Sequence, residues 1–192
     1  LAWLINLFNF MDGIDGSASL QCLLTCLTIG ALRLIAAPAA NLAIATLSLG
    51  GVFAGFLFFN WPSARLFMGD AGSLPAGLLL GVLAIAAVRI DSRLVFCWFV
   101  SMSPFLLDTG YTLLRRMREG KRITEAHSEH IYQRCFRRYG ARSVDLGLLG
   151  LHLILLMPIC IAASVEFAPL WTLASLTLFP QLFLIAKFRG LQ

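Results

Sequence analysis

The sequence predicts an all-α fold, a polytopic bundle of transmembrane helices, and two observations support this. Of its 192 residues, 59% are hydrophobic and 13% are charged, whereas a soluble domain carries about 25% charged residues. The apolar residues are gathered in runs of roughly 20 residues, which is long enough to cross a bilayer as a helix. We therefore expect the lipid bilayer to be a partner of this chain.

Six complete spans and one partial span are expected. A helix already under way at Leu1 ends near Phe10, and the complete spans lie near residues 17–36, 41–58, 74–88, 94–114, 144–164 and 168–188. Ser73 is expected to be the N-cap of the third complete span, with Pro75 in its first turn. Because the chain opens on Leu inside an apolar run, we interpret residues 1–192 as a single integral-membrane domain, the C-terminal part of a longer chain.

The basic residues favour one orientation in the membrane. Nine of the fifteen Lys and Arg residues lie within residues 115–142, and the positive-inside rule places such a segment in the cytoplasm. Counting spans backwards then puts three polar stretches on that same face, at residues 9–16, 59–73 and 115–142. Most of the basic residues are interpreted as an anchor on lipid headgroups, and nucleic acid is not expected as a partner, since no folded module for it is present.

The first polar stretch contains two carboxylates, Asp12 and Asp15, each followed by a glycine. Residues three apart lie on one face of a helical turn, so both carboxylates could point the same way. Such a pair can bind a metal or accept hydrogen bonds from a base or sugar, and the amide of Asn9 can donate and accept beside it. The alternative is a glycine-rich helix entry with two solvated acids.

The second polar stretch places Asp70 directly after Gly69, in a short break between two apolar runs. Glycine lets the backbone approach a ligand closely, and a carboxylate can hold a hard cation such as Mg²⁺. A helix N-terminus beside this carboxylate would offer amides to phosphate oxygens. The alternative is a tight turn between helices with a solvated aspartate.

The third polar stretch contains His127 and His130, which near neutral pH can donate to phosphate oxygens or relay protons. No third ligand has the spacing of a zinc site. Asp108 lies at the cytoplasmic end of an apolar run, where ionisable residues are candidates for function. Pairing with Arg115 or Arg116, or capping of a neighbouring helix, is the competing interpretation of Asp108.

Together these stretches resemble one family, the polyprenyl-phosphate N-acetylhexosamine-1-phosphate transferases of glycosyltransferase family 4. The motifs that carry the resemblance are NFMDGIDG at 9–16, FNWPSARLFMGDAGS at 59–73, DTGYTLLRR at 108–116 and AHSEHIYQR at 126–134. Their combination in this order is highly specific and covers essentially the whole chain. The sequences of these motifs are most similar to those of the branch that initiates O-antigen synthesis.

The resemblance implies a reaction at the cytoplasmic face of a bacterial inner membrane. A lipid phosphate, usually undecaprenyl phosphate, attacks the β-phosphate of a UDP-N-acetylhexosamine, giving lipid-diphosphate-sugar and UMP. The product would initiate O-antigen or another cell-envelope polysaccharide. Mg²⁺ is the expected cofactor, because it offsets charge on the diphosphate. A second copy of the chain, forming a homodimer, is among the expected partners.

The resemblance also implies roles for particular residues. Asp70 matches the Mg²⁺ ligand, while Asn9, Asp12 and Asp15 match the nucleotide-side motif. The expected catalytic residues are Asp70, Asp12, Asp15, His127 and His130, and the expected substrate-binding residues are Asn9, Asn60, Gly69, Ser73, Asp108 and Arg134.

The sequence departs from the family pattern at two points, and there are two alternatives to an active transferase. The family's aspartate pair on an earlier cytoplasmic loop has no counterpart here, and Ser128 stands where related sequences often have a basic residue. The alternatives to an enzyme are a transporter or lipid-binding scaffold that uses the same acids, and an inactive truncated relative. A transporter would usually show inverted repeats and broken helices near the membrane midplane, and the sequence shows neither.

Overall fold

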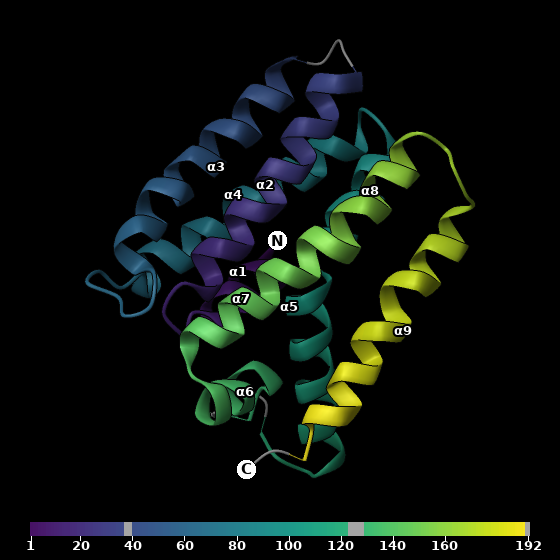
Figure 1. The fold of residues 1–192 in the computed structure, drawn as a ribbon. Helices are drawn as coiled ribbons and strands as arrows, with labels where there is room; N and C mark the ends of the chain where they lie inside the picture. The colour runs from purple at the N-terminus through teal and green to yellow at the C-terminus, as the bar shows by residue number, and fades with distance from the viewer. Residues whose placement is uncertain (37–39, 123–128, 191–192) are drawn as a thin grey trace.

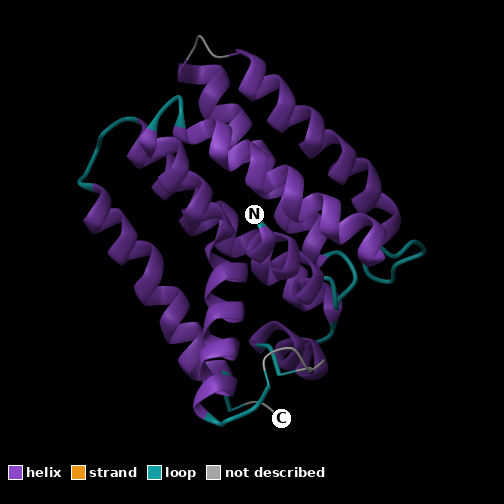
Figure 2. Ribbon diagram, turned by 180° about the vertical axis from the view of Figure 1, so that it is seen from behind, coloured by secondary structure: helices purple, strands orange, loops and turns teal. Residues whose placement is uncertain are grey.

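The computed structural model describes residues 1–36, 40–122 and 129–190, and within these ranges the chain consists of helices and their connections, with no strand. Figure 2 shows this plainly. The helices are α1 (Ala2–Met11), α2 (Ser17–Ala36), α3 (Ala40–Asn60), α4 (Gly69–Val88), α5 (Ser92–Arg118), α6 (Ile131–Tyr139), α7 (Ala141–Leu151), the π-helical η1 (His152–Leu156), α8 (Met157–Ser164) and α9 (Leu170–Phe188).

The six expected spans are confirmed by length and composition. Helices α2, α3, α4, α5 and α9 each form one candidate span, and α7, η1 and α8 together form the sixth, Ala141–Ser164. Helix α1 is the shorter apolar helix that was expected as a partial span. The predicted start of α4 is wrong, because the helix begins at Gly69 and Ser73 lies inside it. Gly69 has a φ of +56°, so the chain turns into the helix there, before Asp70.

Helix α2 occupies the interior of the bundle, whereas α3 and α9 lie at its edges (Figure 1). In the candidate spans, 72% of the residues of α2 are buried, compared with 28% for α3 and 22% for α9. Large apolar side chains such as Phe58 and Phe179 are exposed on these edge helices. In a bilayer these surfaces would face the lipid tails, which are as apolar as the exposed side chains.

Helix α1 packs closely across α4, and this contact sets the geometry of the site. A Cβ atom at Gly77 of α4 would lie 2.6 Å from the backbone oxygen of Leu4. Only a glycine therefore lets the two helices approach so closely, as small residues do between membrane helices. The crossing brings the C-terminal end of α1 to the first turn of α4.

The described parts of the three polar stretches lie at the same end of the bundle, as expected. The connections α1–α2 and α3–α4 and the helix α6 lie at one end of the molecule, opposite the connections α4–α5 and α8–α9 (Figure 1). Hydrogen bonds join them: the Ala64 N–H donates to Asp15 Oδ2 at 3.0 Å, and the Tyr132 hydroxyl donates to the Phe10 carbonyl at 2.9 Å. Segments far apart in the sequence thus form one polar surface.

Candidate active site

The connection between α1 and α2 gives Asp12 and Asp15 different hydrogen-bond partners. Helix α1 ends at Met11, and residues 12–16 form a turn in which Gly16 has a φ of +84°. The expectation that both carboxylates share one face of a helical turn is therefore wrong, because the turn precedes the helix. Asp15 accepts the hydrogen bond from Ala64, whereas Asp12 accepts one from the backbone of Gly69. Both carboxylates still reach the same segment, the connection between α3 and α4 and the turn that begins α4.

The first turn of α4 carries Asp70, and the side chain of Asn9 reaches it from α1. The Asn9 amide donates to Asp70 Oδ1 at 2.7 Å and lies 3.5 Å from Ser73 Oγ. A negative charge in the first turn is stabilised by the helix dipole, so Asp70 also favours the start of α4. Ser73 is fully buried beneath this turn. Asn9, Asp70 and Ser73 are thus brought together as predicted, with Ser73 in a different place in the helix.

Asp12 and Asp70 form a pair of neighbouring carboxylates. Burial raises the pKa of Asp12 to about 6; the Gly69 N–H acts against this shift, and the charge of Asp70 adds to it. Within the described residues no cluster of three or more His, Cys, Asp or Glu could hold a metal ion. Mg²⁺ is bound in many phosphate-transfer sites by one or two carboxylates, together with waters and substrate phosphates. The pair fits that requirement.

Asn60, the last residue of α3, is a buried link between two connections. Its Oδ1 accepts from the Gly16 N–H at 3.0 Å and from the Ser19 hydroxyl at 2.7 Å, and its Nδ2 donates to the Leu66 carbonyl at 2.9 Å. The side chain is 4% exposed. These bonds hold the α1–α2 turn to the end of α3, while substrate binding by Asn60 stays a prediction.

Asp108 caps helix α6. Its Oδ1 accepts from the Ile131 N–H at 2.9 Å and its Oδ2 from the Tyr132 N–H at 2.8 Å. Of the two structural interpretations in the sequence analysis, capping of a neighbouring helix is confirmed and pairing with the arginines is wrong, because Arg115 and Arg116 pair with other acids. The two amides satisfy both carboxylate oxygens, so substrate binding by Asp108 stays a prediction.

His130 lies directly before α6 and against the end of α1. Its Nδ1 is 3.5 Å from Asp108 Oδ1, and its ring stacks on Phe10 with the centroids 6.4 Å apart. The side chain is 2% exposed, so it lies beneath the polar surface. The other predicted histidine, His127, lies outside the described residues.

Arg134 ties α6 to two neighbouring backbones. Its Nε donates to the Glu129 carbonyl at 3.2 Å and its Nη1 to the Arg189 carbonyl at 2.7 Å. The guanidinium thus joins α6 to the residue that follows α9. Its predicted contact with substrate stays a prediction.

Comparison with known proteins agrees with this layout. The model of the family "Glycosyl transferase family 4" matches residues 1–88, which include the motifs around Asp12 and Asp70. The chain belongs to glycosyl transferase family 4. The expected family is thereby confirmed, and with six membrane-length helices the protein is a multi-pass membrane protein of this family.

The chain is also similar to three curated proteins. The phospho-N-acetylmuramoyl-pentapeptide-transferase of Streptococcus thermophilus is 33% identical over 135 residues, 64% of this chain and 38% of the relative. The decaprenyl-phosphate N-acetylglucosaminephosphotransferase of Mycolicibacterium smegmatis is 34% identical over 155 residues, 68% and 37% respectively. The probable undecaprenyl-phosphate N-acetylglucosaminyl 1-phosphate transferase of Bacillus subtilis is 26% identical over 136 residues, 69% and 38%.

The match covers less than two fifths of the length of each of these relatives. Their names contain different sugars and different polyprenyl groups. The O-antigen-initiating branch that the motifs favoured therefore stays a prediction.

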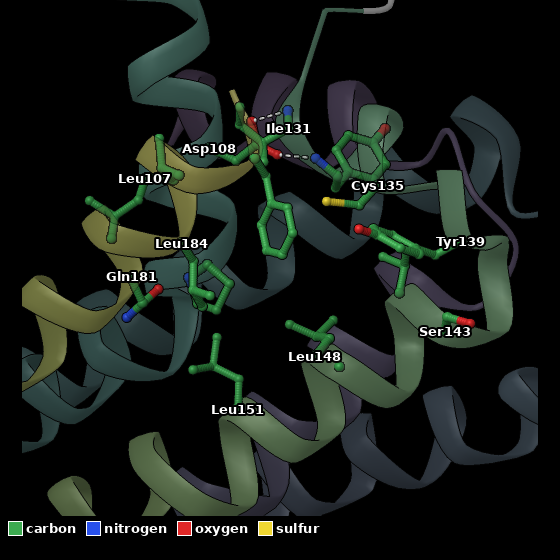
Figure 3. Close-up of a pocket in the computed structure, with 16 residues that line it drawn as sticks. Leu107, Asp108, Ile131, Cys135, Tyr139, Ser143, Leu148, Leu151, Gln181 and Leu184 are labelled. Atoms are coloured by element: carbon green, nitrogen blue, oxygen red, sulfur yellow. Dashed lines mark hydrogen bonds between the residues drawn. The ribbon is translucent and has the colours of Figure 1, made fainter. Parts of the chain in front are cut away.

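A cavity of about 450 Å³ lies beside α6, between α5, α7 and α9. In Figure 3, Leu148 and Leu151 of α7 and Leu184 of α9 border this space, and Asp108 lies at one end with its carboxylate bonded to α6. The lining is mostly apolar. The cavity therefore adjoins the third polar stretch on one side and the membrane-spanning helices on the other.

Two residues that join the elements of this candidate site were not anticipated from the sequence. Tyr132 joins α6 to α1 through its hydroxyl, and Asp145 of α7 accepts a hydrogen bond from Ser17 at 2.5 Å. Tyr132 could have been identified from the sequence, because it lies within the AHSEHIYQR motif. Asp145 lies at the start of an apparently ordinary span, and no pattern marked it.

Proposed function

We propose that the protein transfers a sugar 1-phosphate from a UDP-N-acetylhexosamine to a polyprenyl phosphate such as undecaprenyl phosphate, releasing UMP. The activities named for its family 4 relatives support this class of reaction. The proposal extends to initiation of O-antigen or another cell-envelope polysaccharide at the cytoplasmic face of a bacterial inner membrane. The concentration of Lys and Arg in residues 115–142 supports this orientation.

The main support for the proposal is that Asn9, Asp12 and Asp70 lie close together. These residues come from two different motifs, and the bond from Asn9 to Asp70 and the mutual influence of the two carboxylates join them. A purely structural turn would not need two neighbouring carboxylates, one of them half-buried, because their charges repel. A cation that lies between them would remove this repulsion.

Mg²⁺ is the cofactor that we propose for this pair, with Asp70 as one ligand and Asp12 as a second. When bound, the ion would neutralise charge on the diphosphate of the donor. The residues contribute the rest: Asn9 fixes the orientation of the Asp70 carboxylate, and the Ala64 N–H and Asn60 fix the turn that carries Asp15.

The reaction that we propose is an in-line phosphoryl transfer. An oxygen of the lipid phosphate forms a bond to the β-phosphorus of the donor, and the bond from that phosphorus to the bridging oxygen breaks. The bridging oxygen leaves with the α-phosphate as UMP. Positioning and charge stabilisation supply most of the catalysis in such transfers, which suits a site whose side chains are held by several hydrogen bonds.

The cavity beside α6 supports the choice of a lipid acceptor. Its apolar lining is suited to part of a polyprenyl chain, and Asp108, which lines it, has its Oδ1 3.5 Å from His130 Nδ1. A chain in this cavity would have its phosphate end near the polar surface. We assign His130 and Arg134 to that phosphate as part of the proposal.

The test is UMP release by membranes that express the complete reading frame. The reaction needs undecaprenyl phosphate, Mg²⁺ and a panel of UDP-N-acetylhexosamines, each omitted once. Release that requires both the lipid and one donor supports the transferase, and the donor identifies the sugar. If no donor of the panel gives UMP, the transferase is excluded and a scaffold or inactive relative takes its place.

A further inference from the structure

Asp145 is a fully buried carboxylate on α7, within the span Ala141–Ser164. Its Oδ1 accepts a hydrogen bond of 2.5 Å from the hydroxyl of Ser17, the first residue of α2. Its Oδ2 is buried and has no hydrogen-bond partner among the residues that the structure describes. Burying a carboxylate that accepts only this hydrogen bond within the described chain costs free energy.

The α1–α2 turn closes directly over this carboxylate. A Cβ atom at Gly16 would collide with Asp145 Oδ2, and Gly16 has a φ of +84°, a conformation that side chains disfavour. The backbone of the turn and the carboxylate therefore fit only because residue 16 is glycine. The contact joins α7 to the residue that directly follows Asp15.

The same turn is held on another side by α3. Asn60 accepts from the Gly16 N–H at 3.0 Å, and Asp15 accepts from the Ala64 N–H at 3.0 Å. The Gly16–Ser17 turn is thus fixed between α3 and α7. Without the contact to α7, the turn that carries Asp15 would be held only by its hydrogen bonds to Asn60 and Ala64.

We propose that Asp145 is a positioning residue, which fixes the Gly16–Ser17 turn through its acceptor oxygen and thereby sets Asp15 in the site. Asp145 acts through the turn, since its fully buried side chain contacts Ser17 and Gly16 of that turn. The catalytic part of this role rests on the proposed function. The structural part, fixing the turn, does not.

The variants Asp145→Asn and Asp145→Ala separate an acceptor role from a charge role. Asparagine keeps an acceptor for Ser17, whereas alanine removes it. Because misplacement of a site by about 1 Å can cost about a hundredfold in rate, we expect Asp145→Ala to lower kcat per folded enzyme at least about tenfold with little change in KM. Asp145→Asn should stay within about threefold of wild type, and Ser17→Ala should resemble Asp145→Ala.

A second readout reports the turn without any activity. Ile14 of the turn is 7% exposed, so Ile14→Cys should react slowly with N-ethylmaleimide. Cys135, the only native cysteine in the described chain that is not buried, is replaced by serine in this background. We expect Asp145→Ala to speed labelling at least tenfold and Asp145→Asn to leave it unchanged, with Asp91→Ala at the far end of the bundle as the unchanged control.

The two readouts distinguish the two claims. Faster labelling in Asp145→Ala without UMP release by wild type would retain the fixed turn and reject the transferase. Unchanged labelling in Asp145→Ala would overturn the positioning role, whatever the activity. Loss of both activity and protection in Asp145→Asn would also overturn it, because the ionisable carboxylate would then be required.

Discussion

The side-chain amide of Asn9 donates a hydrogen bond of 2.7 Å to the carboxylate of Asp70, which lies 61 residues further along the chain. This bond joins the end of α1 to the first turn of α4. It is possible because α1 crosses α4 at Gly77, where any side chain would meet the backbone of α1. The bond therefore depends on the packing of the two helices as well as on the two residues.

Replacing Asn9 by alanine should lower the rate of UMP release about tenfold. The reason is that a lost hydrogen bond to a charged group costs about 1.5–3 kcal/mol, part of which the Asp70 carboxylate recovers from water. Asn9→Asp should be slower still, because it places like charges together. Steady-state rates check this, with Asn41→Ala, an exposed asparagine at the opposite end of α3, as the control. A wild-type rate for Asn9→Ala would remove the bond from the mechanism.

The need for Mg²⁺ should depend on pH through Asp12. Burial raises the pKa of this carboxyl to about 6, above its ordinary value of 3.8. The folded protein therefore favours protonated Asp12, and this contribution to stability is lost as the pH rises from 3.8 through about 6. Mg²⁺ competes for the same carboxylate.

We accordingly expect the Mg²⁺ concentration for half-maximal UMP release to fall about tenfold between roughly pH 5 and pH 7. In Asp12→Asn the requirement should be higher and nearly independent of pH over this range. Titration with Mg²⁺ at several pH values measures both. The same pH dependence in wild type and Asp12→Asn would show that another group is responsible.

Removing the cap of α6 should reduce activity more than stability explains. Asp108→Ala frees two backbone N–H groups, which costs about 1–2 kcal/mol for a helix cap, and it releases the helix that follows His130. Asp91→Ala is the matched control, because Asp91 caps α5 at the other end of the bundle. The midpoint temperature of thermal unfolding should fall in both variants, while UMP release per folded enzyme should fall only in Asp108→Ala. Equal activity in the two variants would contradict a role for α6 in the site.

Gly16→Ala should destabilise the protein by about 1–3 kcal/mol, because it places a side chain at positive φ and against Asp145. Gly150→Ala in α7 is the control, since a Cβ atom there meets nothing within 4 Å. Alanine in a helix interior should be neutral or stabilising by about 0.5–1 kcal/mol. Thermal unfolding of the two variants measures the difference. A stable Gly16→Ala protein would show that the turn relaxes freely.

Much of the fold followed from the sequence, because apolar length alone limits where a membrane helix can lie. The joining of the three polar stretches also followed, since the number of spans fixes the face on which each connection emerges. The start of α4 did not follow: Ser73 and Pro75 looked like a helix entry, yet the turn at Gly69 begins the helix earlier. Local residue preferences do not distinguish a helix start at Gly69 from one at Ser73, because packing decides between them.

The arrangement of three residues of the candidate site was predicted from the sequence, whereas the residues that support them were not. Asn9, Asp12 and Asp70 lie together as their motifs indicated, because motif residues carry a signal in their own spacing. Asp145 carries no such signal, because its burial arises only when α7 packs against the Gly16–Ser17 turn. Tertiary packing decides which polar residues of a span lie inside, and periodicity gives no sign of it.

The most direct test of this account compares Asp70→Asn with Asp91→Asn. Each variant removes one carboxylate from the start of a helix, Asp70 in the first turn of α4 and Asp91 before α5 at the opposite end. UMP release is measured per folded enzyme with the accepted donor, undecaprenyl phosphate and Mg²⁺. We predict that Asp91→Asn keeps the wild-type rate and that Asp70→Asn loses nearly all of it. Wild-type release by Asp70→Asn would contradict the central claim that Asp70 and its neighbours form the active site.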